Sequence, residues 1–234
     1  MCYYSPSLSF ESNQARSRKD LDFDSNAKVV ETSNRGFLIG IEGIDAAGKR
    51  TQTSLLDEWL RSKGVRTHVL SFPDYTTSLG TEIRRFFTGE RNYSAHVIHL
   101  LFAANRWEHR SDLVNWLSKG EVLVVNRYTE SNLAYGMANG LKLSWLMSLE
   151  EGMPKSDQVI LLDATPSTVR SRRKERNDRY ENDLQLQQRT RDFYRELAEK
   201  FGWAVVDAGR SVDAVHGRVK KAITELFARH DQTI

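Results

Sequence analysis

The chain has 234 residues, of which 39% are hydrophobic and 28% are charged, and its formal net charge is +3. This length and balance are typical of a folded protein of one or two domains with a sizeable core. The small net charge argues against nucleic acid as a partner. A single cysteine, Cys2, excludes an internal disulfide framework, and we therefore expect a cytoplasmic protein.

The first 35 residues are polar and of mixed charge, without a sustained apolar period. We expect residues 1–35 to form a disordered or loosely attached extension, and a folded domain to occupy residues 36–234. The opening residues lack the basic and apolar regions of a secretory signal. No apolar run approaches the roughly 18 residues of a membrane span, so we expect no membrane partner.

The domain begins with a short apolar run over residues 37–41, which predicts a buried strand. Gly43-Ile-Asp-Ala-Ala-Gly48-Lys49 follows, and a helical pattern over residues 51–63 begins behind it. That order is the setting of a phosphate-binding loop, because glycines let backbone N–H groups converge on phosphate oxygens while the lysine supplies a positive charge. One position departs from the pattern, since Arg50 stands where a Ser or Thr is usual.

Short apolar runs and helical patterns alternate through the rest of the chain. The runs predict strands over residues 67–72, 121–125, 158–162 and 203–206. The helical patterns cover residues 77–87, 95–117, 131–138, 144–150, a stretch from residue 167, 181–201 and 212–230. This alternation predicts an α/β fold with a parallel sheet covered by helices on both faces. Ligands of such sheets bind beyond the carboxyl ends of the strands, where the phosphate loop, Pro73-Asp74, Asn126-Arg127 and Asp163 lie.

Two further groups of residues suggest chemistry at that edge. Phe102 and Arg106 are four positions apart, so on a helix they share one face and could sandwich and hydrogen-bond a planar base. Packing plus a surface salt bridge is the alternative explanation of this pair. Residues 170–179 read R-S-R-R-K-E-R-N-D-R, which is compatible with a solvated helix face or a nucleic-acid patch. Beside a phosphate loop, such a run can instead be a lid whose arginines neutralise phosphates.

The order of the motifs resembles the thymidylate kinase family, P-loop enzymes that make dTDP from dTMP and ATP. The segments concerned are G-I-D-A-A-G-K, F-P-D, L-L-F-A-A-N-R-W-E, N-R-Y…S-N-L-A-Y-G, M-P-K-x-D and R-Y-E-N, within about residues 36–229. The L-F-x-A-N-R-W-E pattern is the most specific, because in the family it serves thymine recognition. The resemblance implies a three-layer P-loop sandwich with a five-stranded parallel sheet and a basic lid. It also implies ATP and dTMP as small-molecule partners, Mg²⁺ as cofactor and a homodimer.

The resemblance also implies roles for individual residues. ATP would be held by the loop residues Gly43, Ile44, Asp45, Ala46, Ala47, Gly48, Lys49, Arg50 and Thr51. The acceptor dTMP would be held by Asp45, Phe72, Pro73, Phe102, Arg106, Arg127, Ser131, Tyr135 and Tyr180. Phosphoryl transfer requires in-line positioning and charge neutralisation. The groups implied for the transfer itself are Lys49, Arg127, Arg172 and Arg176.

Several of these roles are more detailed. Asp45 would receive the 3′-hydroxyl of the dTMP sugar, and Arg127 would bind the dTMP phosphate. Phe102 would stack on thymine while Arg106 hydrogen-bonds its edge. Tyr135 would pack close to the sugar and disfavour a 2′-hydroxyl.

The chain departs from the family pattern at four positions. Ala46 and Tyr75 replace arginines of some members, and the lid arginines would compensate for the first. Arg50 removes a hydroxyl that usually binds Mg²⁺, and Asn126 replaces an Asp that lies beside the metal. An amide carries no charge, so the resemblance assigns no residue here as a metal ligand.

The departures leave alternatives open. An active enzyme could hold Mg²⁺ mainly through ATP phosphates and water, with Glu42 or Asp163 further out. The alternatives are a nucleotide-binding relative with weakened catalysis and a kinase that acts on dUMP or a deoxynucleoside.

Overall fold

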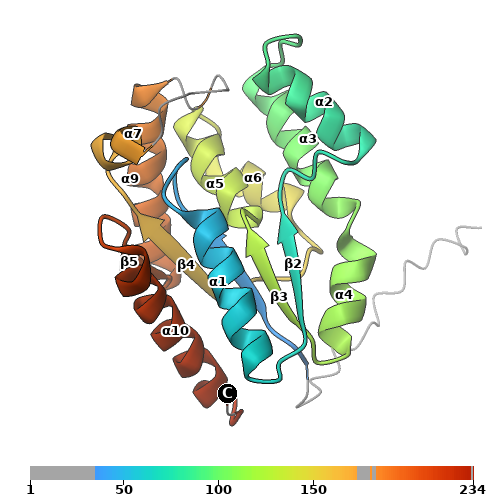
Figure 1. Ribbon diagram of the computed structural model, residues 1–234. Coiled ribbons are helices and arrows are strands. Elements are labelled where there is room, and N and C mark those ends of the chain that lie inside the picture. The colour runs from blue at the N-terminus through green and yellow to red at the C-terminus, as the bar shows by residue number, and fades with distance from the viewer. Residues whose placement is uncertain (1–34, 173–179, 181–182, 233) are drawn as a thin grey trace, which may run out of the picture. The chain divides into compact units, whose positions relative to one another are not determined.

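The computed structural model describes residues 35–172, Tyr180, residues 183–232 and Ile234. Within them, five parallel strands form one sheet, which confirms the expected parallel five-stranded sheet (Figure 1). The strand order is β2-β3-β1-β4-β5. Their bounds are β1 Leu38–Glu42, β2 Thr67–Ser71, β3 Val122–Asn126, β4 Gln158–Asp163 and β5 Ala204–Asp207. The central strand β1 pairs with β3 on one side and with β4 on the other.

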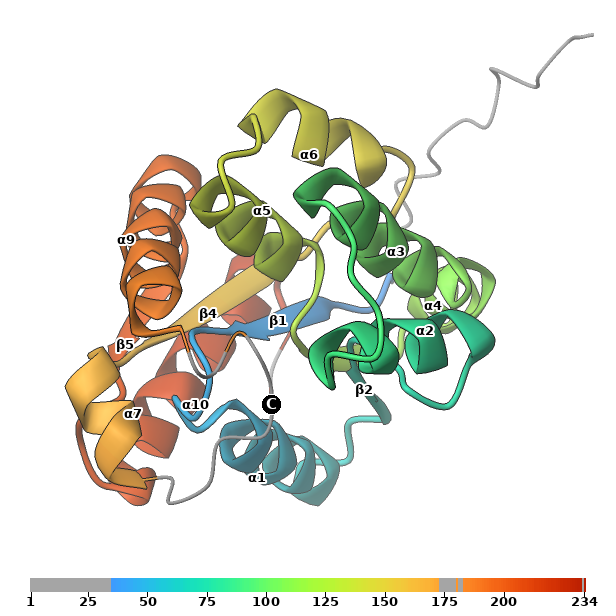
Figure 2. The ribbon, with the colours of Figure 1, turned by 90° about the horizontal axis from the view of Figure 1, so that it is seen from above.

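Helices cover both faces of the sheet (Figure 2). Helices α1 and α10 pack on one face, and α4, α5 and α9 pack on the other. Their bounds are α1 Lys49–Ser62, α4 Arg110–Ser118, α5 Thr129–Ala138, α9 Leu184–Phe201 and α10 Val212–Arg229. The remaining helices are α2 Ser78–Phe87, α3 Ala95–Trp107, α6 Leu143–Leu149 and α7 Pro166–Arg172. None of the described helices is long and apolar enough to cross a membrane.

The core consists of two apolar clusters, and the side chains of β1 divide between them because strand side chains alternate between the faces of the sheet. Ile39 and Ile41 of β1 belong to the larger apolar cluster, which includes Leu56 and Leu60 of α1. Leu38 points the other way and packs with α4 in a smaller cluster. This alternation places the last residue of β1, Glu42, on the face that α5 and α9 cover.

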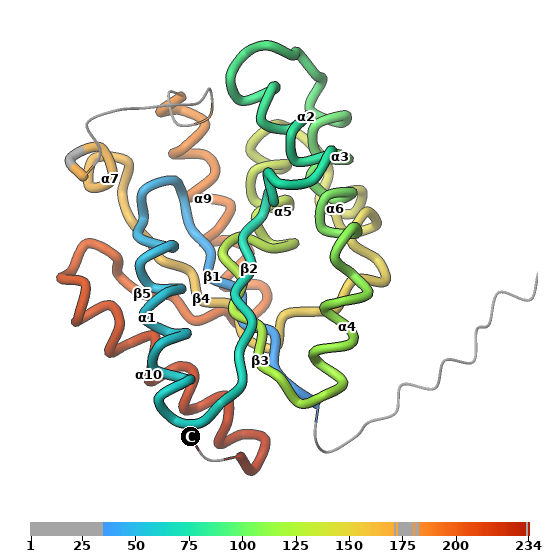
Figure 3. The backbone as a smooth tube through the Cα atoms, turned by 45° about the vertical axis from the view of Figure 1, so that its right-hand side comes forward, coloured from blue at the N-terminus to red at the C-terminus, as the bar shows by residue number. Residues whose placement is uncertain are grey.

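Helices α2 and α3 lie side by side beyond the carboxyl ends of the strands (Figure 3). The single helix predicted over residues 95–117 is wrong, since α3 ends at Trp107 and α4 begins at Arg110. No Gly or Pro marks the break. Glu108 accepts hydrogen bonds from Thr77 (2.8 Å) and Asn105 (2.9 Å), and His109 lies 3.2 Å from Asp74. Tertiary contacts with the residues that precede α2 therefore end α3 here. The spacing of apolar residues along the helix contains no information about these contacts.

The remaining element predictions agree with the structure to within a few residues. The helix predicted from residue 181 begins at Leu184, where the Asp183 carboxylate caps it by accepting from the Leu186 N–H (2.8 Å). Residues 1–34 of the extension predicted over residues 1–35, and residues 173–179 of the basic run, lie outside the described residues. From Arg35 onward, the described residues belong to one compact unit.

Candidate active site

The loop between β1 and α1 has the geometry of a phosphate-binding loop. Gly43 has φ +139°, and a Cβ there would lie 2.6 Å from the Leu162 carbonyl oxygen on β4, so only glycine fits. The buried Lys49 ammonium donates to the carbonyl oxygens of Gly43 (3.0 Å) and Ile44 (2.7 Å). Helix α1 starts after Gly48 without a side-chain cap. Its first backbone N–H groups can therefore serve an anionic ligand.

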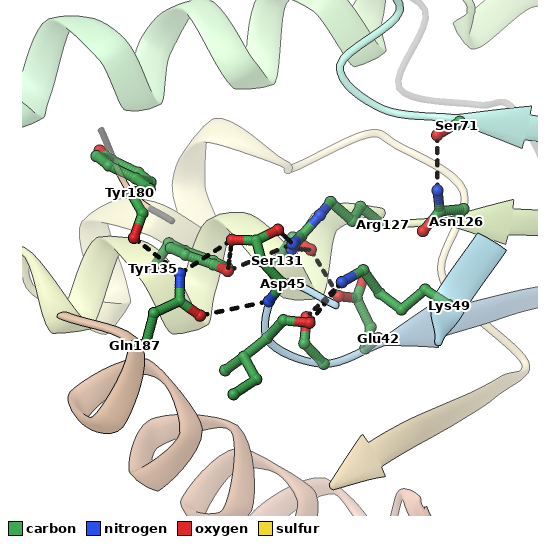
Figure 4. Close-up of polar contacts among 12 residues, drawn as sticks. Glu42, Asp45, Lys49, Ser71, Asn126, Arg127, Ser131, Tyr135, Tyr180 and Gln187 are labelled. Atoms are coloured by element: carbon green, nitrogen blue, oxygen red, sulfur yellow. Dashed lines mark hydrogen bonds and ion pairs between the residues drawn. The ribbon is translucent and has the colours of Figure 1, made fainter. Parts of the chain in front are cut away.

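Asp45 projects from this loop into a dense set of polar contacts (Figure 4). Its carboxylate forms an ion pair with Arg127 and accepts hydrogen bonds from the Tyr135 hydroxyl (3.0 Å) and the Gln187 amide (3.0 Å). Burial by itself would raise the pKa of Asp45. The charges of Arg127 and Lys49, with the bonds from Gln187 and Tyr135, outweigh burial and hold that pKa well below its usual range. Asp45 is therefore a fixed negative charge.

Arg127 follows β3 and faces Asp45 across the carboxyl end of the sheet. Its backbone has φ +63°, which is uncommon for a residue other than glycine. Its backbone N–H donates to the Ile41 carbonyl oxygen on β1 (3.1 Å). The guanidinium lies 5.1 Å from the centre of the Tyr135 ring and contacts the Ser131 hydroxyl at 3.4 Å. Burial opposes its charge, but Tyr135 and Asp45 raise the pKa of Arg127 above its ordinary value. This cation is available for a phosphate at the strand ends.

Glu42, the last residue of β1, binds residues that flank Arg127 and Tyr135. It is fully buried, and its carboxylate accepts from the Tyr128 N–H (2.7 Å), the Ser131 hydroxyl (2.6 Å) and the Tyr194 hydroxyl (2.7 Å). These bonds tie the start of α5 and the middle of α9 to the end of β1. Ser131 is thereby fixed beside Arg127.

A pocket opens next to Asp45 and Arg127. It is lined by all nine residues that the resemblance assigns to dTMP: Asp45, Phe72, Pro73, Phe102, Arg106, Arg127, Ser131, Tyr135 and Tyr180. It is also lined by Tyr75, Phe87, Tyr128 and Asn132. Two pairs of rings form walls, because Phe102 stacks on Phe87 (centroids 5.9 Å apart) and Tyr135 stacks on Tyr180 (5.7 Å). Flat aromatic walls suit a planar ligand.

Arg106 is 3% exposed and forms a buried ion pair with Glu150. Its Nε lies 3.2 Å from Glu150, and its Nη2 contacts the same carboxylate. The alternative of a surface salt bridge is therefore wrong. Among the described residues, the Nη1 group of Arg106 has no hydrogen-bond partner, which leaves its two N–H donors for a ligand in the pocket.

The turn that carries Phe72 and Pro73 is held by α3. The Asn105 side chain accepts from the Asp74 N–H (2.7 Å) and donates to the Asp74 carbonyl (3.3 Å) and the Thr77 hydroxyl (3.0 Å). The Phe72–Pro73 peptide bond is cis. Asn105 thus joins the turn to the helix that bears Phe102 and Arg106.

Gln187 is a site residue that sequence reasoning missed. It lies on α9 and is buried, 142 positions from Asp45. Its amide nitrogen donates to Asp45 and to the Tyr180 carbonyl (2.9 Å), and its amide oxygen accepts from the Asp45 N–H at 3.3 Å. One glutamine in a polar helix carries no signal of this role in the sequence.

Of the two arginines implied for the lid, the structure describes only Arg172. Arg172 ends α7 and donates to the Ala208 carbonyl at 2.5 Å, and it does not line the pocket. Arg176 lies outside the described residues. Their roles at the phosphates stay predictions.

The residues present fit a metal ion that keeps most of its water. No group of three or more His, Cys, Asp or Glu side chains in the described ranges could enclose a metal. Asp163 forms an ion pair with Arg191 (2.6 Å), and the Glu42 carboxylate already accepts hydrogen bonds from Tyr128, Ser131 and Tyr194. Arg50 is exposed on α1. The Asn126 amide nitrogen donates to Ser71 (2.8 Å), while its buried amide oxygen has no partner among described residues. That oxygen can accept from a metal-bound water.

A phosphate-binding loop beside an aromatic pocket with buried arginines defines a P-loop kinase of a small planar phosphorylated substrate. The family model for thymidylate kinase matches residues 41–219 of this chain. The chain belongs to the thymidylate kinase family, and it is an enzyme that phosphorylates dTMP with ATP.

Individual relatives have moderate identity over most of the chain. The human thymidylate kinase is 35% identical over 190 residues, which cover 80% of this chain and 90% of the relative. The Danio rerio enzyme is 36% identical over 189 residues, covering 80% and 89%. The structure of thymidylate kinase from Candida albicans superposes with a TM-score of 0.74 at 31% identity, covering 84% of this chain and 94% of that one.

Proposed function

We propose that the pocket beside Asp45 holds dTMP while residues 43–51 hold the phosphates of ATP. The observation that carries this assignment is the position of Asp45, which belongs to the phosphate loop and yet lines the pocket with Arg127. Donor and acceptor would therefore meet at the carboxyl ends of β1 and β3. The proposed kinase domain covers residues 36–234.

The pocket suits each part of dTMP. Thymine would stack on Phe102 and receive a hydrogen bond from the Nη1 group of Arg106, whose Nε and Nη2 contact Glu150. The deoxyribose would lie against Tyr135 and Tyr180, with its 3′-hydroxyl at Asp45. The phosphate would lie at Arg127, which exchanges part of its pairing with Asp45 for the phosphate charge.

The reaction follows from this placement. A phosphate oxygen of dTMP attacks the γ-phosphorus of ATP in line with the bond to the ADP oxygen, which then breaks. Lys49 and Arg127 would neutralise charge on the phosphates, and Asp45 and the ring walls would fix the acceptor. The result is dTDP and ADP.

Mg²⁺ is the cofactor that the family implies, and it would neutralise the triphosphate of ATP. We propose that ATP phosphates and water hold it, and that the Asn126 amide oxygen accepts from one of those waters. Arg50 is exposed and would take no part in holding the metal ion.

We also propose that the enzyme is a cytoplasmic homodimer. Val97, Leu100 and Trp107 share one face of α3, each 39–46% exposed, and Met147 on the neighbouring α6 is 46% exposed. A second copy of the chain would cover this apolar strip. Two further tryptophans contact histidine rings of the same chain, since Trp116 stacks on His68 (4.1 Å) and Trp145 meets His96 edge-on (5.0 Å).

The activity is tested by incubating the protein with ATP, Mg²⁺ and dTMP and measuring ADP. We expect turnover well above that of Lys49→Met, and rates no greater than that variant's would overturn the proposal. ATP binding without turnover would instead support the weakened relative. A panel of dTMP, dUMP and thymidine separates the other kinase alternatives, and we expect dTMP to be preferred.

A further inference from the structure

A buried polar network lies behind the pocket walls, and His99 is at its centre. His99 is on α3 and is fully buried. Its Nδ1 lies 2.6 Å from the Asn132 amide oxygen, and its Nε2 lies 3.2 Å from the Asn139 amide nitrogen. Its ring also meets Phe102 edge-on, with centroids 5.4 Å apart. Nothing in the proposed phosphoryl transfer uses this residue.

The hydrogen bonds fix one tautomer of His99. The Asn132 amide nitrogen donates to Glu150 (2.9 Å) and to the His99 carbonyl (3.3 Å), so the Asn132 oxygen must face the histidine. His99 Nδ1 therefore carries the hydrogen, and Nε2 accepts from Asn139. The same Asn139 nitrogen contacts the Tyr180 hydroxyl (3.1 Å). Burial, together with the charges of Arg106 and His96, lowers the pKa of His99 to about 4 against the effect of Asn132.

The network therefore has two branches that start at one ring. One branch runs from Nδ1 through Asn132 to Glu150, the carboxylate that orients Arg106. The other runs from Nε2 through Asn139 to Tyr180. Three walls of the pocket, Phe102, Arg106 and Tyr180, are thus supported by His99 directly or through one or two neighbours.

We propose that neutral His99 is a positioning residue for dTMP. It fixes the positions of Arg106, on the base side of the pocket, and Tyr180, on the sugar side, relative to each other. This inference rests on the proposed function, because it takes Arg106 and Tyr180 as contacts of dTMP. A histidine that only fills the core would stabilise the fold without favouring either branch.

Two substitutions separate the branches. The amide nitrogen of Asn takes about the place of Nδ1, so His99→Asn keeps the donor to Asn132 and loses the acceptor for Asn139. The longer Gln reaches about the place of Nε2, so His99→Gln keeps the contact with Asn139 and loses the donor to Asn132. Steady-state kinetics with dTMP and ATP varied in turn, together with thermal melting, are measured for both. The control is His96→Gln, an exposed histidine on the same helix.

We expect His99→Gln to raise KM for dTMP about tenfold, the effect of one lost hydrogen bond of ordinary strength, while KM for ATP changes less than about twofold. We expect His99→Asn to stay within about threefold of the unmodified enzyme at a similar melting temperature. Equal KM values for the two variants, or parallel changes in KM for ATP, would overturn the inference.

Asn139→Ala tests the second branch without changing the buried ring, because Asn139 is only half-buried. We expect KM for dTMP to rise about threefold with melting unchanged, and an unchanged KM would contradict this branch. Arg106→Ala tests the proposed dTMP site separately from the proposed role of His99. If it leaves KM for dTMP unchanged, the proposed dTMP site is wrong. If it raises KM while His99→Gln does not, only the role of His99 is wrong.

Discussion

Gln187 binds Asp45 at two points, since its amide nitrogen contacts the carboxylate and its amide oxygen contacts the backbone N–H. A residue of α9 therefore sets the orientation of a residue in the phosphate loop. The same nitrogen reaches the Tyr180 carbonyl, so one side chain joins the loop to the wall of the pocket.

We expect Gln187→Leu to lower kcat/KM for dTMP by about 5- to 30-fold, or about 1–2 kcal/mol. The reason is that the carboxylate and the backbone N–H of Asp45 each lose a hydrogen-bond partner. The neighbouring Gln188→Leu is the matched control, since Gln188 is exposed and, within the described part of the chain, its side chain bonds only to Asp192. Acceptor-dependent kinetics measure the effect. Equal values for the two variants would show that Gln187 does not orient Asp45.

We expect Asn126→Asp to leave kcat unchanged or to raise it by a few fold. A carboxylate at this position would add charge near the phosphates and would accept from a metal-bound water at least as well as the amide oxygen. A titration with Mg²⁺ should show half-maximal activity at a lower concentration. Asn115→Asp, the same change at an exposed position on α4, is the control. A large loss of activity would mean that the amide itself is needed.

We expect Glu130→Gln to stabilise the protein much more at pH 8 than at pH 5. Burial, followed by the charge of Glu42, raises the pKa of Glu130 from 4.5 to about 7. The pKa of Glu130 is higher in the folded protein than in the unfolded chain. Ionisation of Glu130 therefore lowers the free energy of unfolding as the pH rises from the unfolded pKa to the folded pKa, and the loss is complete above the folded pKa. Urea unfolding should show a gain on the order of 2–3 kcal/mol at pH 8. A gain of equal size at pH 5, or any gain in exposed Glu151→Gln, would contradict this explanation.

We expect Leu100→Asp to convert a dimer into monomers, because the carboxylate would be buried in the apolar strip on α3. Sedimentation equilibrium measures the change. Val212→Asp, at an exposed apolar position on α10, should leave the mass unchanged. A protein that is monomeric before substitution would refute the proposed homodimer.

Much of the fold could be predicted because its signals are local. The apolar run before Gly43 and the apolar runs of β3 and β4 are buried in the sheet, so hydrophobicity alone marks them. The break at Glu108 could not be predicted, because it depends on Thr77 and Asp74, which are distant in sequence.

The candidate site divides in the same way. The residues around the pocket stand in motifs of recognisable order, and the structure brings those assigned to dTMP to one pocket. Gln187, Asn139 and the role of His99 could not be found from the sequence. Each acts through a hydrogen-bond partner that is distant in sequence, and a polar side chain in or beside a helix is usually solvated.

The Asn105 contacts have a mechanical consequence. Because Asn105 fixes the Phe72–Pro73 turn to α3, the turn and the Phe102 wall form one piece on one side of the pocket. Asp45, Arg127 and Gln187 form the opposite piece and belong to the sheet and α9. Any movement of α3 on ligand binding would therefore carry Phe102 and the Phe72–Pro73 turn together, so the thymine side of the pocket would shift as one unit.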